Sequence, residues 1–64
     1  MSSDEIIRVA LRGTDEERRM VEEDYGMEML DVLDDLCCQA TSKGLVDLAN
    51  RLGEAHMALS RGGE

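Results

Sequence analysis

The chain has 64 residues and a mass of 7.1 kDa, which leaves room for one small domain over residues 1–64. Fifteen acidic residues against seven basic ones give a net charge of −8, which argues against electrostatic binding to nucleic acid or to an anionic membrane. Proline, Phe and Trp are absent and Tyr25 is the single aromatic residue, so little in the composition suits a stacked base or a ligand pocket.

Two capping motifs indicate where the first two helices begin. Ser2 precedes Glu5 by three residues, and Thr14 precedes Glu17 by three. At this spacing the hydroxyl and the carboxylate bond to backbone amides that have no other partner at a helix start. We therefore predict a short first helix over 3–12 and a second helix that begins directly after Thr14.

The rest of the chain predicts an antiparallel helical hairpin. With no proline to interrupt it, the second helix is expected to span 15–42, and Gly44 is a natural left-handed cap behind it. A third helix then spans 45–60, and residues 61–64 form a frayed tail. At about 1.5 Å per residue the second helix is the longer one, so the third covers it only as far as Gly26. The expected fold class is all-α, a short helix followed by a long-helix/short-helix hairpin.

The predicted core is small, and a second copy of the chain would complete it. The third helix carries apolar residues at alternating spacings of three and four, which is a heptad seam: Leu45, Leu48, Leu52, Ala55 and Leu59. Two packed helices and a short third one enclose little apolar volume. We therefore predict that the chain forms a homodimer in which the helices build a bundle.

Five acidic residues of the second predicted helix recur at intervals of seven, four, three and four, which places them on one face opposite the apolar seam. This acidic stripe consists of Glu17, Asp24, Glu28, Asp31 and Asp35. No basic residue stands between Met20 and Ser42 to relieve the repulsion between them, which costs helix stability. Three interpretations stay open: a solvated outer face, a surface that attracts a basic partner, and adaptation to a high-salt habitat.

Apolar residues outside the core pattern form a second candidate surface. Met20 and Met27 fall on the edge of the acidic stripe, where no core is expected. Val46, Gly53 and Met57 form a line beside the seam of the third helix. Such groups either close the core of a dimer or contact another protein, because thioethers adapt readily to a partner surface.

The residues that usually carry chemistry are too few and too scattered. Cys37 and Cys38 are neighbours, so on a helix their side chains point about 100° apart and cannot bind one metal ion together. His56 is the single histidine, and no acidic residue stands three residues before it. We therefore predict no catalytic, cofactor-binding or metal-binding residue, no cofactor and no enzyme activity. Two thiols without a disulfide framework suit a reducing compartment, so we expect a cytoplasmic protein.

The function expected from these features is binding rather than catalysis. We expect a small acidic regulator or adaptor that docks through its helices on another protein, for which a basic surface is one candidate, and that contacts neither nucleic acid nor membrane. The alternative is a nucleic-acid-mimicking inhibitor of the kind that phages or mobile elements encode, which would occupy a basic groove. A direct nucleic-acid binder would have to use a small cluster of basic residues that acidic ones interrupt: Arg8, Arg12, Arg18 and Arg19.

Overall fold

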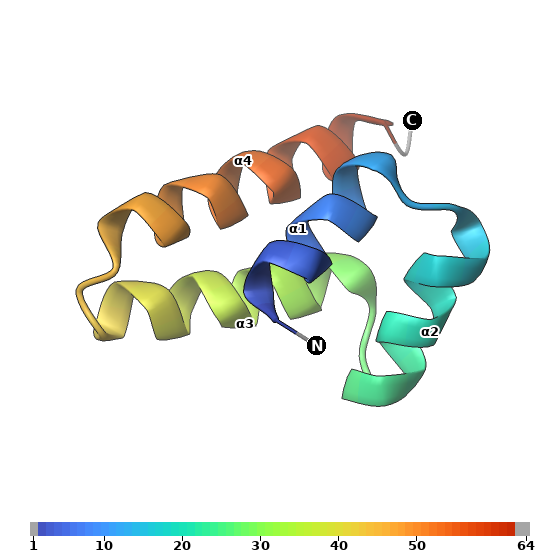
Figure 1. The fold of residues 1–64 in the computed structure, drawn as a ribbon, viewed down its shortest axis with the longest axis horizontal. Helices are drawn as coiled ribbons and strands as arrows, with labels where there is room; N and C mark the ends of the chain where they lie inside the picture. The colour runs from blue at the N-terminus through green and yellow to red at the C-terminus, as the bar shows by residue number, and fades with distance from the viewer. Residues whose placement is uncertain (1, 63–64) are drawn as a thin grey trace.

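The computed structural model describes residues 2–62, and over that range it contains four α-helices and no β-strand (Figure 1). The helices are α1 (Ser3–Arg12), α2 (Asp15–Tyr25), α3 (Met29–Ser42) and α4 (Val46–Gly62). Helices α3 and α4 lie side by side and run in opposite directions, α1 packs across them, and α2 stands at the end away from the α3–α4 turn (Figure 1). The prediction of an all-helical chain is confirmed.

Helix α1 begins and ends where its local sequence predicts, although only the Ser2 half of the predicted capping motif forms among the described residues. The Ser2 hydroxyl accepts a hydrogen bond from the Glu5 amide at 3.3 Å, which caps the helix start. Its end at Gly13 depends on a close approach, because a Cβ atom there would lie 2.5 Å from the Val9 carbonyl oxygen. The buried side of α1 consists of Ile6, Ile7, Val9 and Ala10. These residues cover one side of the α3–α4 pair.

The prediction of one continuous helix over 15–42 is wrong. The predicted capping box at Thr14 is present, but α2 ends at Gly26, whose φ of 69° places it in the left-handed region. Glycine adopts this conformation without the Cβ clash that other residues meet. The turn folds α2 back, so that Val21 on one side and Met29 on the other are both buried in the same core. A straight helix would carry Val21 into solvent beyond the end of α4.

The turn between α3 and α4 follows the sequence closely. Gly44 has a φ of 75°, as expected for a left-handed cap, and the Leu45 amide donates to the Ala40 carbonyl at 2.9 Å. Helix α4 begins at Val46 rather than at residue 45. Of the predicted tail, Arg61 and Gly62 belong to α4, while residues 63 and 64 lie outside the described part of the chain.

The core contains residues from all four helices. Its largest fully buried side chains are Ile6, Val21, Val32, Leu33 and Leu52. The predicted seam is confirmed at Leu52 and Ala55, which are fully buried. Leu48 and Leu59 also pack against the core but are only half-buried. At Leu45 the seam fails, because this residue lies in the turn and exposes 48 % of its surface. At the rim, the Arg51 guanidinium binds the Asp4 carboxylate at 2.8 Å and joins α4 to α1.

The elbow at Gly26 gives a direct test of the fold. Replacing Gly26 with Ala should lower the free energy of unfolding by about 1 kcal/mol, since a Cβ is strained at positive φ. Urea denaturation followed by circular dichroism measures the change, and Gly44→Ala, at a second left-handed turn, is the reference with the same expected sign. A Gly26→Ala protein that is more stable than the original would mean that residues 15–42 form one helix in solution.

Candidate functional site

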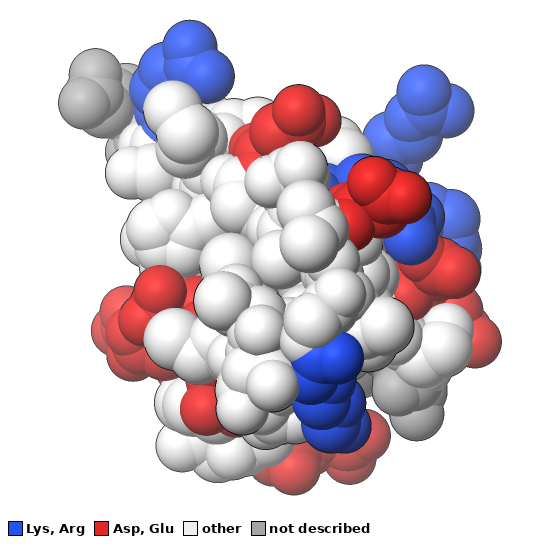
Figure 2. Space-filling model, turned by 90° about the vertical axis from the view of Figure 1, so that its left-hand side faces the viewer, with Lys and Arg blue, Asp and Glu red and all other residues white. Residues whose placement is uncertain are grey.

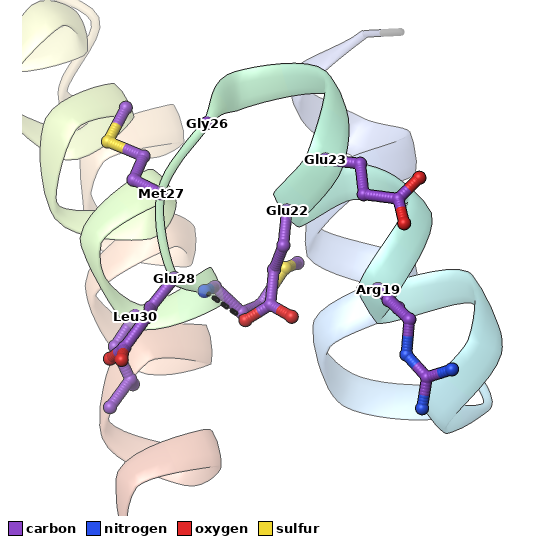
Figure 3. A pocket seen from close by; sticks show the side chains of 8 residues that line it. Arg19, Glu22, Glu23, Gly26, Met27, Glu28 and Leu30 are labelled. Carbon is purple, nitrogen blue, oxygen red and sulfur yellow. Dashed lines mark hydrogen bonds between the residues drawn. The ribbon is translucent and has the colours of Figure 1, made fainter.

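An open groove runs along the elbow where α2 meets α3 (Figure 3). Both helices and the connection between them contribute to its lining, which consists of Arg19, Glu22, Glu23, Gly26, Met27, Glu28, Met29 and Leu30. The side chains of Arg19 and Glu23 project from α2, those of Glu28 and Leu30 from the α3 side, and Glu22 lies between them (Figure 3). We call this feature the elbow groove.

Glu22 holds the elbow together. Its Oε2 atom accepts a hydrogen bond from the Met29 amide at 2.9 Å in a partly buried position (Figure 3). The residue at the N-cap position of α3 is Glu28, whose own side chain makes no capping bond within residues 2–62. The cap of α3 therefore comes from α2, seven residues earlier in the chain. A carboxylate at a helix start also interacts favourably with the helix dipole.

This role of Glu22 predicts a difference between two neighbouring acids. Replacing Glu22 with Ala should lower the free energy of unfolding by about 1 kcal/mol, because the Met29 amide loses its acceptor. The matched control is Glu23→Ala, which removes the same charge from an exposed position beside it. Urea unfolding of both variants makes the comparison. Equal stability of the two would show that the capping bond contributes nothing.

The elbow groove combines an apolar floor with an acidic rim. Met29 is buried, and Met27 and Leu30 are half-buried beside it. Three carboxylates, those of Glu22, Glu23 and Glu28, and one guanidinium, that of Arg19, line the same groove, while the Met27 side chain packs against the core and points away from Glu22 and Glu23 (Figure 3). An apolar side chain can therefore be buried here while positive charges next to it meet the rim.

The predicted acidic stripe is not one continuous face. Glu17 and Asp24 lie on α2, whereas Asp31 and Asp35 lie on α3 beyond the elbow. The Glu17 carboxylate accepts from the Thr14 amide at 3.0 Å, so it belongs to a cap rather than to a free surface.

Apart from Glu17, the acids of the predicted stripe form only small exposed groups on separate helices. Asp31 and Asp35 are exposed, four residues apart on α3, and Asp35 also accepts from the Gln39 side-chain amide at 2.9 Å. Asp24 is exposed on α2. Of the five predicted acids, only Glu28 lines the elbow groove.

The predicted apolar contact residues fall into two groups. Met27 lines the elbow groove, while Met20 is 62 % exposed on α2. Val46 and Met57 are 66 % and 58 % exposed on α4, with Gly53 half-buried between them. Val46 lies next to the exposed Leu45 at the α3–α4 turn, and Figure 2 shows an uncharged surface in the middle of this end of the molecule, with charged side chains around it.

The thiols and the histidine have ordinary structural surroundings. The half-buried Cys37 thiol lies 3.5 Å from the Ala49 carbonyl oxygen and donates to it, and Cys38 is exposed. His56 is half-buried on α4. Across the part of the chain that the structure describes, no three His, Cys, Asp or Glu side chains are grouped so that they could hold a metal ion. None of the four described helices has the length and apolar character needed to span a membrane.

Sequence reasoning missed most of the elbow groove. Arg19, Glu22, Glu23 and Leu30 were not among the predicted site residues, because an unbroken helix would spread them over about 16 Å along its axis with no groove between them. The signal that could have found them is Gly26, the one glycine inside an otherwise helical acidic segment. Comparison with known proteins finds no family, curated protein or solved structure that matches this chain.

Proposed function

We propose that this protein is a cytoplasmic, non-catalytic regulator or adaptor, homodimeric, which binds another protein through the elbow groove. The occupant is an amphipathic helix with an apolar anchor and basic flanking residues. One observation carries the proposal: the half-buried Met27 and Leu30 line the same groove as the carboxylates of Glu22, Glu23 and Glu28. A helix that inserts an apolar face into a groove is a recurrent mode of peptide recognition.

The chemistry of the elbow groove supports this occupant. Met27 is unbranched and polarisable, so it can adjust to differently shaped apolar side chains. Glu23 and Glu28 can each pair with a Lys or Arg on either side of such an anchor. The net charge of −8 adds a long-range attraction that raises the association rate of a basic partner.

The alternative, a nucleic-acid-mimicking inhibitor, has less support. A mimic needs carboxylates that follow one another along a surface as phosphates do. Here the elbow divides the predicted acidic stripe between two helices, and Glu17 is engaged in the α2 cap. The elbow groove, in contrast, offers an apolar contact that a phosphate-like surface would not need.

A model peptide tests the proposal. The probe is a synthetic helical peptide with Leu at positions i, i+3, i+4 and i+7 and Lys elsewhere, compared with a second peptide in which Glu replaces every Lys. Fluorescence anisotropy should show tighter binding of the basic peptide, with an affinity that falls as salt screens the charges. A basic peptide that binds no better than the acidic one would contradict the proposal.

Two charge-reversed variants locate the contact. The double change Glu23→Lys and Glu28→Lys alters the rim and leaves the capping Glu22 intact, and it should weaken peptide binding by about tenfold or more. The matched control, Asp31→Lys with Asp35→Lys, changes the net charge by the same amount on the outer side of α3 and should have a much smaller effect. The reverse order of effects would assign binding to the acidic residues of α3 instead of the elbow groove.

A further inference from the structure

Helix α4 has an uncharged outer side. At about 100° per residue, six of its residues fall within an arc of about 100°. We call this set the α4 outer face, and it consists of Val46, Ala49, Asn50, Gly53, Met57 and Ser60, of which Ala49 and Gly53 are half-buried and Ala49 also packs against the core. None of the six is charged, although 34 % of the residues in the chain are. Val46 and Met57 are also two of the large apolar residues that the fold leaves exposed.

Gly53 is the residue on this face that the fold of a single chain does not explain. Inside a helix only proline is less favourable than glycine, so a glycine in the middle of α4 lowers its stability. A Cβ atom at Gly53 would have nothing within 4 Å among the described residues, so no neighbour in the chain requires its absence. Gly13, by comparison, avoids a clash with Val9, and Gly44 has a positive φ. The absence of a Cβ atom at Gly53 would let the backbone of a second chain approach α4 closely at this position.

Charge indicates that the approaching backbone belongs to a second copy of this chain. Two copies with a charge of −8 each repel one another, so the most favourable contact is one in which neither presents an acidic group. In a two-fold interface a charged residue near the axis also lies close to the same residue of the second copy, and the two like charges repel. None of the six residues of the α4 outer face is charged, and the exposed Glu54 and Arg61 lie beyond its edge.

We propose that the α4 outer face packs antiparallel against the same face of a second copy, with the two helices closest at Gly53. Met57 lies four residues after Gly53, and Val46, Ala49 and Asn50 lie seven, four and three residues before it. In an antiparallel pair centred on Gly53, Met57 of one copy is therefore level with the middle of the hole that these three residues and Gly53 form in the other. This is the knobs-into-holes arrangement, made twice by symmetry. The inference rests on the homodimer of the proposed function but uses none of the residues of the elbow groove.

The substitution Gly53→Ala separates an effect on the helix from an effect on the contact. Within one chain, Ala favours the helix, so the urea midpoint at low protein concentration should rise. Between chains, the added Cβ keeps the backbones apart, so the dissociation constant of the dimer should increase by about tenfold or more. Sedimentation equilibrium measures the dissociation constant. The matched control is Gly62→Ala, the other helical glycine without a neighbour within 4 Å in the described chain, which lies outside the face and should leave dimerisation unchanged.

A second variant places a charge where the knob is expected. Met57 is exposed in the single chain, so Met57→Asp should leave the helical signal in circular dichroism unchanged while it abolishes the dimer. An original protein that stays monomeric throughout the micromolar range would overturn the inference, and so would a dimer that both Gly53→Ala and Met57→Asp leave intact. Binding of the basic peptide to the elbow groove is measured separately on the same variants, so a failed dimer contact is distinguishable from a failed groove.

Discussion

At Gly26 the backbone enters a left-handed turn, and the direction in which the chain then continues decides what the other helices can contact. The turn brings α2 back toward the start of α3, where Val21 and Met29 enter one core. Glu22 then lies beside the first amide of α3 and caps it. The elbow is therefore held by the backbone preference of one glycine, by two buried side chains and by one hydrogen bond. The elbow groove is the outer side of this arrangement.

Some of the acidic residues stabilise the fold itself. Two of the acids complete helix starts, Glu17 within α2 and Glu22 across the elbow, where a negative charge is favourable at the helix N-terminus. The elbow also relieves the repulsion that a continuous helix would suffer. Helix α2 ends before Glu28, so Asp24 and Glu28 no longer stand one turn apart on one helix. Two further acids, Glu23 and Glu28, line the elbow groove without such a capping bond among the described residues.

The two proposed contacts use different parts of the molecule. The elbow groove belongs to α2 and α3, and the α4 outer face belongs to α4 alone. A dimer formed through α4 would leave both grooves open and would carry two of them. Two sites on one particle bind a partner with two matching segments more tightly than one site does, provided that the geometry lets both engage.

The local sequence by itself determined the helical class, the start of α1 and α2 at Ser2 and Thr14, and the left-handed turn at Gly44. These features depend on residues three or four positions apart, so a single segment contains all the information needed. The tertiary structure alone decided that Gly26 would break the predicted long helix and that Glu22 would cap α3. A glycine without a proline nearby can remain helical or turn left-handed at similar cost. The balance is settled by the burial of Val21 and Met29 against segments far away in the chain, which no local pattern records.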